Sequence, residues 1–131
     1  MNTKTSVLII EDEKNICDFI ATALLNQDYR VFKSYSGTDG ISQITSRCPD
    51  ILLLDLGLPD MDGMDIIREV RQWSSMPIIV ISARTQEEEK VLALDAGADD
   101  YITKPFGTSE LLARIRTAVR HLSGANGQGN Q

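Results

Sequence analysis

Short apolar runs recur along the chain and are separated by longer segments of mixed polarity. Two runs, at residues 51–54 and 78–81, are continuous and rich in branched side chains. Runs of this kind are typical of parallel strands that are buried on both faces of a sheet. Further runs lie at 7–10, 31–32 and 101–102. We expect the last two to form edge strands.

Each segment between these runs carries apolar residues at helical spacing. The periodicity predicts helices that include residues 16–24, 41–44, 64–70, 91–94 and 111–122. Each helix is expected to turn its apolar residues towards the core, among them Val91, Leu92 and Leu94 of the fourth helix. The predicted caps are Ser36, Thr85 and Thr108 before helices and Gly97 after one.

This alternation of strand and helix, repeated five times, predicts an α/β fold. Alternating elements form a parallel sheet with helices on both faces. A five-stranded sheet of this kind commonly takes the doubly wound, flavodoxin-like strand order 2-1-3-4-5. One domain is expected over residues 1–122. The Gly-, Asn- and Gln-rich segment 123–131 has no apolar periodicity and is interpreted as a flexible linker or an added tail.

Composition and charge narrow the range of functions. The 131 residues carry a formal net charge of -6, which argues against direct binding to a nucleic-acid backbone and suits a cation or a basic partner. Cys17 and Cys48 are too few for a disulfide framework and are interpreted as free thiols of a reducing compartment. The sequence shows no signal-peptide pattern and no membrane span, so a cytoplasmic location is expected.

Polar residues follow the ends of four predicted strands. Glu11 and Asp12 follow the first strand, and Asp55, Ser82 and Lys104 stand at the ends of the third, fourth and fifth. Ligand sites in open parallel sheets lie beyond the carboxyl ends of the strands, near the switch in strand order. Taken singly, each residue would be a helix cap, a turn residue or a surface charge. Because polar residues stand at four strand ends on the same edge of the sheet, we instead predict a functional site there.

The residue types at this rim indicate a chemistry. Crowded carboxylates repel one another, and a bound divalent cation removes that penalty. Oxygen ligands without a nearby His or thiolate favour Mg²⁺. Asp55 would then attack a phosphoryl group to form an aspartyl phosphate. Lys104 would neutralise the transferred charge, and Ser82 would donate a hydrogen bond to a phosphoryl oxygen.

Four segments in order carry a resemblance to a known family: VLIIEDE (7–13), ILLLDLGLPDMDG (51–63), PIIVISAR (77–84) and GADDYITKPF (97–106). Over residues 5–122 the chain resembles the receiver domains of bacterial two-component response regulators, which implies the CheY-like form of the fold with five helices. Two positions depart mildly from the family pattern. Glu11 stands where Asp is commoner, and Ser82 stands where Thr is commoner.

The resemblance implies a role for each carboxylate of the rim. Asp55 would accept a phosphoryl group from a sensor histidine kinase. Mg²⁺ would be bound by Asp12, Asp55 and the backbone carbonyl of Gly57, with Glu11 helping to position it. The domain would catalyse its own phosphorylation and dephosphorylation and would not be an enzyme for an external substrate.

Other positions would couple the phosphoryl group to the rest of the domain. By the same resemblance, Ser82 and Lys104 would contact the phosphoryl group. Tyr101 would turn inward on activation. The peptide bond before Pro105 would be cis, which suits a tight turn beside a site.

The segments GADDYITKPF and ELLARIRTAVR resemble the OmpR/PhoB subfamily, and LDLGLPDMDG with RQWSSMPIIVISAR is similar to its regulators of potassium-transport genes. The subfamily implies that phosphorylated receivers form a homodimer through the fourth helix, fifth strand and fifth helix, to control a DNA-binding output domain outside this chain. The implied ion pairs between subunits are Lys90 with Glu110, Asp100 with Arg114, and Asp95 with Arg116. Alternatively, these charged residues form a solvent-exposed face of the domain and make no pairs between subunits.

Three other functions stay open at this point. A Mg²⁺-dependent phosphatase would use Asp55 as nucleophile but needs a general acid, and Gly57 stands where an Asp would be expected. A flavin-binding module needs a phosphate-binding loop after the first strand, yet Glu11, Asp12 and Glu13 there repel phosphate. A receiver that is never phosphorylated would act as a docking module alone.

Overall fold

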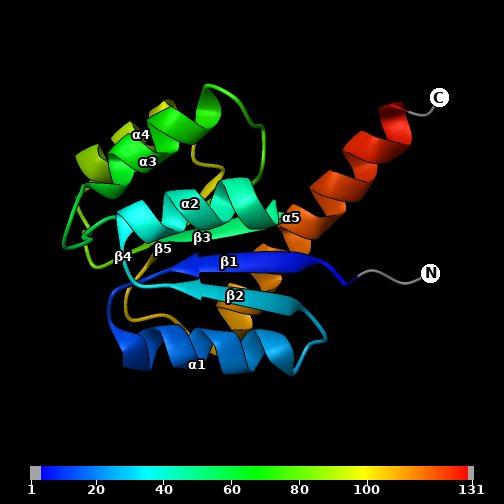
Figure 1. Ribbon diagram of the computed structural model, residues 1–131, viewed down its shortest axis with the longest axis horizontal. Helices are drawn as coiled ribbons and strands as arrows, with labels where there is room; N and C mark the ends of the chain where they lie inside the picture. The colour runs from blue at the N-terminus through cyan, green and yellow to red at the C-terminus, as the bar shows by residue number, and fades with distance from the viewer. Residues whose placement is uncertain (1–3, 130–131) are drawn as a thin grey trace.

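Residues 4–129 are described by a computed structural model (Figure 1). In this part of the chain five parallel strands form one sheet in the order β2-β1-β3-β4-β5. The strands are β1 (Ser6–Ile10), β2 (Arg30–Ser34), β3 (Ile51–Asp55), β4 (Ile78–Ser82) and β5 (Asp100–Thr103). The helices that follow them are α1 (Lys14–Leu25), α2 (Gly37–Arg47), α3 (Gly63–Arg71), α4 (Glu87–Ala96) and α5 (Thr108–Gly129). The predicted fold class, strand order and edge strands are confirmed.

The two faces of the sheet contribute to two separate hydrophobic clusters. Val7 and Ile9 of β1 pack with residues of α1 and α5, whereas Leu8 and Ile10 pack with residues of α2 and α3 on the opposite face (Figure 1). Successive residues of a strand point to opposite faces of the sheet. The strands β1, β3 and β4 are buried along their whole length, which explains their unbroken apolar runs.

The helix ends agree in part with the predicted caps. Ser36 is the N-cap of α2, and its hydroxyl accepts a backbone hydrogen bond of 3.2 Å. Gly97 ends α4 with a φ of 126°, a conformation that favours glycine. The prediction for Thr85 is wrong, because Gln86 is the N-cap of α4 and three glutamates in the first turn stabilise that end through the helix dipole. Thr108 is the first residue of α5 and not its cap.

The prediction that α4 buries its apolar residues is also wrong. Val91, Leu92 and Leu94 are 46%, 55% and 45% exposed, and Ala93 is the buried residue of this helix. At about 100° of rotation per residue, positions 91, 92 and 94 spread around the helix and do not share one face. One side of the helix faces the core, and Ala93 occupies it. Helix α4 therefore presents three large apolar side chains on its outer surface.

Helix α5 continues beyond Leu122, the last apolar position of its predicted periodicity, and reaches Gly129. Its last turns extend away from the sheet (Figure 1). Residues 130 and 131 lie outside the described part of the chain, and a linker role for 123–131 stays a prediction. Within residues 4–129, no helix combines the length and the apolar character needed to cross a membrane.

Candidate functional site

Three carboxylates meet at the carboxyl end of the sheet. Glu11 and Asp12 follow β1, and Asp55 is the last residue of β3, which pairs with β1 in parallel. One oxygen atom of each side chain lies within 4.8 Å of the others. Glu11 and Asp55 are 2% and 7% exposed. The structure therefore places Asp12 beside Asp55, as the strand order led us to expect.

Lys104 faces these carboxylates from the end of β5. Its Nζ atom lies 2.8 Å from Glu11 Oε1, 3.7 Å from Asp55 Oδ1 and 4.0 Å from Glu13 Oε1. The peptide bond between Lys104 and Pro105 is cis. One ammonium group thus lies among several carboxylates, and the negative charges outnumber the positive charge that contacts them.

Burial dominates the acid–base properties of the two buried carboxylates, Asp55 and Glu11. Desolvation raises the pKa of Asp55, and the opposing effects of Lys104 and the Gly57 N–H do not cancel it. Desolvation likewise raises the pKa of Glu11, although the contact with Lys104 lowers it. Burial alone would lower the pKa of Lys104, but the contact with Glu11 and the charge of Asp55 raise it overall. Both carboxylates are therefore costly to keep ionised without a further cation.

One buried oxygen atom of Glu11 lacks a hydrogen bond. Its Oε2 atom accepts one from the Glu13 N–H at 3.1 Å. The Oε1 atom has no partner in hydrogen-bond geometry among the described residues, although it forms the 2.8 Å ion pair with Lys104. The carboxylates of Glu11, Asp12 and Asp55 together offer a ligand set made of oxygen alone. Such a set fits a hard divalent cation such as Mg²⁺ better than it fits zinc.

A cavity of about 360 Å³ joins the residues at the strand ends. Its lining is formed by Asp12, Glu13, Asp55, Gly57, Ser82, Ala83, Arg84 and Lys104. Glu11 is not among the lining residues: it is buried, 2.8 Å from Lys104 Nζ, with a carboxylate oxygen within 4.8 Å of Asp55. Tyr101 does not line the cavity: its ring is half-buried, and its hydroxyl donates a 2.8 Å hydrogen bond to the Arg84 carbonyl. The structure thus brings the expected site residues together around one cavity. Tyr101 lies outside its lining and is hydrogen-bonded to Arg84, which lines it.

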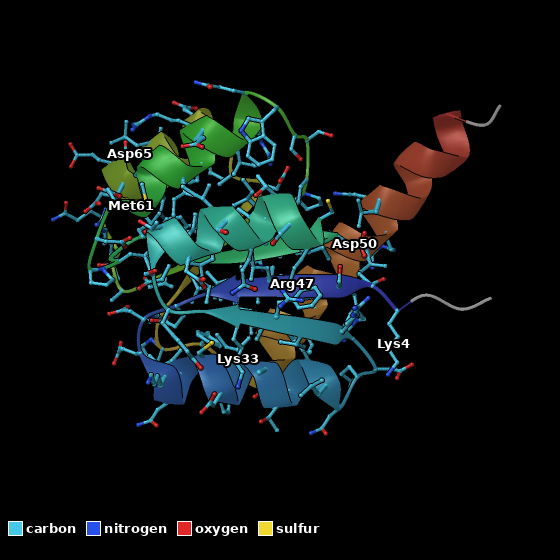
Figure 2. The ribbon with its side chains drawn as sticks, viewed as in Figure 1. Lys4, Lys33, Arg47, Asp50, Met61 and Asp65 are labelled. Carbon is cyan, nitrogen blue, oxygen red and sulfur yellow. The ribbon has the colours of Figure 1, made fainter. Side chains whose placement is uncertain are left out.

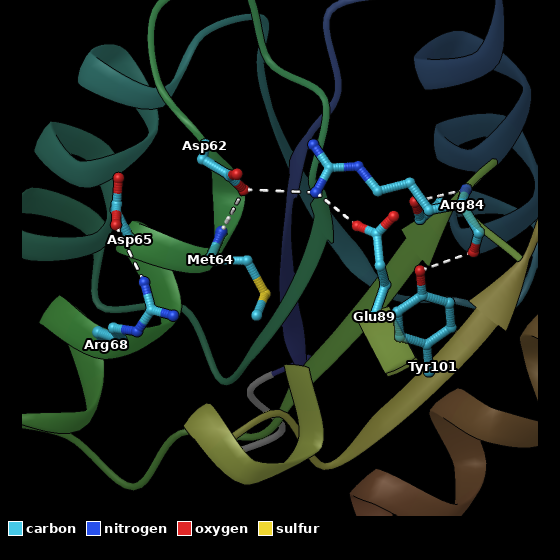
Figure 3. A network of polar contacts seen from close by, with 8 residues as sticks. Asp62, Met64, Asp65, Arg68, Arg84, Glu89 and Tyr101 are labelled. Atoms are coloured by element: carbon cyan, nitrogen blue, oxygen red, sulfur yellow. Dashed lines mark hydrogen bonds and ion pairs between the residues drawn. The ribbon is translucent and has the colours of Figure 1, made fainter. Parts of the chain in front are cut away.

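A polar network surrounds Arg84 that the sequence did not predict (Figure 3). Arg84 Nη1 lies 3.1 Å from Glu89 Oε1 on α4 and 3.7 Å from Asp62 Oδ1, which belongs to the N-cap residue of α3. The Arg84 N–H donates a 3.0 Å hydrogen bond to Ser82 Oγ. Asp62 before a helical periodicity is a recognisable cap signal. No spacing along the chain connects it with Arg84.

The loop between β3 and α3 is held against α2. The Asp60 carboxylate accepts hydrogen bonds from the Gly37 N–H at 2.8 Å and from the Thr38 N–H and hydroxyl at 2.9 Å and 2.7 Å. The Thr38 hydroxyl, followed by the backbone N–H groups, lowers the pKa of Asp60 to about 2. Met61, labelled in Figure 2, covers Gly37, where an added Cβ would lie 2.4 Å from its sulfur. Because this loop carries Gly57, α2 supports one wall of the cavity.

The charged residues implied for a dimer face lie on three neighbouring elements. They are Lys90 and Asp95 on α4, Asp100 on β5, and Glu110, Arg114 and Arg116 on α5. Within the single chain, Arg114 Nη1 lies 3.4 Å from Asp100 Oδ2, and Arg114 Nη2 lies 3.6 Å from Glu110 Oε2. Asp95 and Arg116 are exposed, and no ion pair joins either of them to another described side chain. Pairing of these charges between subunits stays a prediction.

Known proteins resemble this chain in sequence and in fold. The chain matches the response regulator receiver domain family over residues 7–116. It is 53% identical over 119 residues to the KDP operon transcriptional regulatory protein KdpE of Escherichia coli (strain K12), covering 91% of this chain and 53% of that protein. It is 47% identical over 121 residues to the transcriptional regulatory protein KdpE of Mycobacterium tuberculosis, covering 92% and 54%. A CheY-like receiver domain protein from Methanospirillum hungatei has a TM-score of 0.89 at 27% identity, covering 94% of this chain and 99% of that one.

The chain therefore belongs to the response regulator receiver domain family, whose members are signalling modules. Within that family its sequence is similar to the two regulators named KdpE. It spans about half the length of the curated relatives it matches. The predicted family is thus confirmed on the segments that first suggested it.

Proposed function

We propose that this domain is a phosphorylation-dependent switch whose input is Asp55. The observation that carries the proposal is the position of Asp55 at the end of β3, in one cavity with Asp12, Ser82 and Lys104. Response regulators receive phosphoryl groups from sensor histidine kinases, and membership of the receiver family supports the same class of donor here.

In the proposed transfer, a carboxylate oxygen of Asp55 attacks the phosphorus atom of a phosphohistidine. A P–O bond forms as the P–N bond breaks, and the leaving imidazole takes up a proton from water. Lys104, 3.7 Å from Asp55 Oδ1, would neutralise charge on the phosphoryl oxygens. Ser82 would turn its hydroxyl to donate a hydrogen bond to one of these oxygens.

Mg²⁺ is the proposed cofactor of this site. Asp12, Asp55 and the Gly57 carbonyl would hold it, and Glu11 would orient these ligands from its buried position. When bound, the ion neutralises the crowded carboxylates and the incoming phosphoryl oxygens. The crowding of the Glu11, Asp12 and Asp55 carboxylates and the raised pKa of Asp55 support a site that a cation completes.

An apolar hollow beside the acidic cavity supports docking of a kinase. It has a volume of about 480 Å³ and is lined by Asn15, Ile16, Phe19, Ala83, Lys104, Pro105 and Phe106. Ala83 and Lys104 line both cavities. A kinase helix that covers the hollow would therefore bring its phosphohistidine close to Asp55.

The proposed output of the switch is a homodimer formed through α4, β5 and α5. The exposed Val91, Leu92 and Leu94 support an interface on α4, because large apolar side chains left on the surface gain free energy when a partner buries them. Tyr101 lies on β5, and its inward rotation would link the cavity to this face. The acidic and basic residues of α4, β5 and α5 would set the register of the two subunits.

Similarity to the regulators named KdpE supports a role in transcription. One of them is described as a regulator of the KDP operon. We propose that this domain acts in the cytoplasm and controls a DNA-binding output domain at potassium-transport genes. Its net charge of -6 suits a domain that makes no direct contact with nucleic acid.

Three alternative functions fit the site less well. A phosphatase of this kind would need a general acid two residues after Asp55, and Gly57 has no side chain to supply one. A flavin phosphate would meet the carboxylates of Glu11, Asp12 and Glu13 after β1, which repel it. If the domain were a docking module that is never phosphorylated, the acidic cavity at the strand ends would have no function.

Intact mass spectrometry after incubation with acetyl phosphate and Mg²⁺ tests the proposal. We expect the parent protein to gain one phosphoryl group, and we expect removal of Mg²⁺ with a chelator to prevent the gain. The Asp55→Asn variant should gain none, and sizing of the phosphorylated parent should show a dimer. Equal labelling of the variant would refute the proposal. Repeated release of phosphate from a phosphomonoester would support the phosphatase instead.

A further inference from the structure

The loop between β3 and α3 carries Gly57, the proposed carbonyl ligand of Mg²⁺, and it contacts the start of α2. We propose that Asp60 is a positioning residue of this loop, whose hydrogen bonds to α2 fix the backbone at Gly57 and so raise the affinity of the site for Mg²⁺. The inference deepens the proposed function and rests on it, because Gly57 is a ligand only in the proposed Mg²⁺ site.

No side-chain packing holds Gly57 in place. The residue is exposed, and an added Cβ would meet no atom within 4 Å. Because glycine adopts more backbone conformations than other residues, the position of its carbonyl depends on the rest of the loop. The two ends of the loop are joined, since Gly57 forms an antiparallel bridge with Asp62. A contact at the tip of the loop therefore restrains Gly57 as well.

Asp60 provides this contact from the tip of the loop. Its Oδ1 atom accepts a 2.8 Å hydrogen bond from the Gly37 N–H. Its Oδ2 atom accepts bonds of 2.9 Å and 2.7 Å from the Thr38 N–H and hydroxyl. The first N–H groups of a helix have no partner within the helix, and this end of a helix favours a negative charge. Because one helix end holds both carboxylate oxygens, the side chain of Asp60 has a fixed orientation.

The start of α2 is a firm anchor for this carboxylate. The Ser34 hydroxyl, at the end of β2, donates a 2.7 Å hydrogen bond to Asp39 Oδ2 in the first turn of α2. Met61, the neighbour of Asp60 in the loop, packs over Gly37 so closely that an added Cβ there would overlap it. Asp60 consequently ties the loop to a helix that is itself held to the sheet.

Loss of these hydrogen bonds should loosen Gly57 and leave the fold in place, because Asp60 is an exposed residue. Removal of a group that orients a metal ligand typically weakens metal binding by about 10- to 100-fold. Asp60 acts through the backbone of the loop and from the surface of the domain. We therefore expect Asp60→Ala to weaken Mg²⁺ binding by a smaller factor, about three- to tenfold.

The negative charge of Asp60 offers a different explanation for such a loss, because its removal would weaken the attraction of the site for a cation. Thr38→Val separates the two explanations, since it removes a hydroxyl that donates to Asp60 and changes no charge. We expect Thr38→Val to weaken Mg²⁺ binding by about two- to threefold. The same substitution should have no further effect in the Asp60→Ala background, because the partner of the hydroxyl is already absent.

Asp50→Ala is the matched control. Asp50 is also an exposed carboxylate, and it accepts hydrogen bonds from the Ser6 N–H at 2.9 Å and the Ser6 hydroxyl at 3.2 Å. It precedes β3, and Figure 2 shows it at the opposite end of the strands from Met61. Asp50→Ala thus removes a negative charge and similar hydrogen bonds without touching the loop. Its affinity for Mg²⁺ should equal that of the parent.

Two measurements test the inference on the unphosphorylated proteins. Calorimetry gives the dissociation constant for Mg²⁺. Nitrogen-15 relaxation in the metal-free proteins gives the order parameters of the Gly57 and Leu58 N–H groups, which report backbone motion on the picosecond to nanosecond timescale. Asp60→Ala and Thr38→Val should lower these order parameters and raise the dissociation constant. Asp50→Ala should change neither.

Equal Mg²⁺ affinities of Asp60→Ala and Asp50→Ala would overturn the inference. A loss confined to Asp60→Ala, with Thr38→Val at the parental affinity, would overturn it too, because charge alone would then explain the loss. If the parent protein bound no Mg²⁺, the proposed cofactor would be refuted instead. The order parameters of the metal-free proteins would still decide whether Asp60 fixes the backbone at Gly57.

Discussion

The ammonium group of Lys104 lies 2.8 Å from the buried Oε1 atom of Glu11, which is closer than its 3.7 Å distance to Asp55 Oδ1. Glu11 therefore anchors Lys104 while the lysine faces Asp55. A charge that is already in place needs little reorganisation when new negative charge arrives on Asp55. The same ammonium group would compete with a bound metal ion for these carboxylates.

Replacement of Lys104 should thus affect two measurements in opposite directions. We expect Lys104→Gln to slow phosphorylation by acetyl phosphate by about 10²-fold, because a preorganised charge next to the reacting group is lost. We expect the same variant to bind Mg²⁺ more tightly in calorimetry, because a competing cation is removed. Lys33→Gln, which breaks a surface pair with Asp18, is the control. Weaker Mg²⁺ binding by Lys104→Gln would contradict this account.

The carboxylate of Asp60 should contribute to stability in a defined pH window. Its pKa is about 2 in the folded protein, below the ordinary value of 3.8. A lowered pKa means that the ionised group stabilises the fold above pH 3.8, and that this contribution disappears as the pH falls towards 2. We expect Asp60→Ala to be less stable than the parent at pH 7, with a gap that closes between about pH 4 and pH 2. Thermal unfolding at several pH values measures the gap.

Asp95→Ala is the control for this pH effect, because Asp95 is an exposed carboxylate and no described residue pairs with it. Its stability relative to the parent should change little across the same range. A gap between Asp60→Ala and the parent that stays constant down to pH 2 would show that the hydrogen bonds to α2 do not depend on the charge.

Two glycines near Asp55 should respond differently to the same substitution. A Cβ at Gly63 would lie 2.7 Å from the Asp55 carbonyl oxygen and 2.7 Å from Leu56 Cα. Both are backbone atoms, and moving the backbone to relieve the clash would cost folding free energy. A Cβ at Gly57 would meet no atom within 4 Å. We expect Gly63→Ala to lower the free energy of unfolding by about 1–3 kcal/mol and Gly57→Ala by less than about 0.5 kcal/mol. Urea unfolding measures both, and equal losses would contradict the packing described.

Most of the fold could be read from periodicity, because the strands buried on both faces leave unbroken apolar runs. Placement of Asp12 beside Asp55 followed from the strand order, since parallel strands end at one edge. Helix α4 misled the sequence argument. Val91, Leu92 and Leu94 were counted as a core face, although their angular positions cannot all face the sheet. The apolar residues of this segment indicated a helix but did not show which side of the helix packs against the sheet.

Contacts between distant loops were beyond the reach of the sequence. Arg84 meets Asp62 across a separation that no spacing rule connects. The same is true of Asp60, whose carboxylate holds the start of α2 through Gly37 and Thr38. In both cases the tertiary fold brings a carboxylate close to its partner. The local sequence around each residue does not predict that contact.

Charge reversal should test the proposed dimer face. Asp95 and Arg116 are suited to this test because no ion pair within the described chain would be broken by changing them. We expect Asp95→Arg to weaken dimerisation of the phosphorylated protein about tenfold, since an attractive pair becomes a repulsive one. The double variant Asp95→Arg with Arg116→Asp should recover the affinity. Analytical ultracentrifugation measures both, with Arg68→Glu on α3 as the control.

If the double variant did not recover the dimerisation affinity, Asp95 and Arg116 would not pair with each other in the dimer. An unchanged affinity in each single variant would remove both residues from the interface. Under the second result the exposed apolar residues of α4 would need a different partner.

The position of the phosphoryl group tests the central claim most directly. The labelled protein would be digested and mapped by peptide mass spectrometry, with and without hydroxylamine, which cleaves acyl phosphates. The account predicts that the phosphoryl group lies on Asp55 and is released by hydroxylamine. A hydroxylamine-stable group on another residue, such as Ser82 or His121, would contradict it.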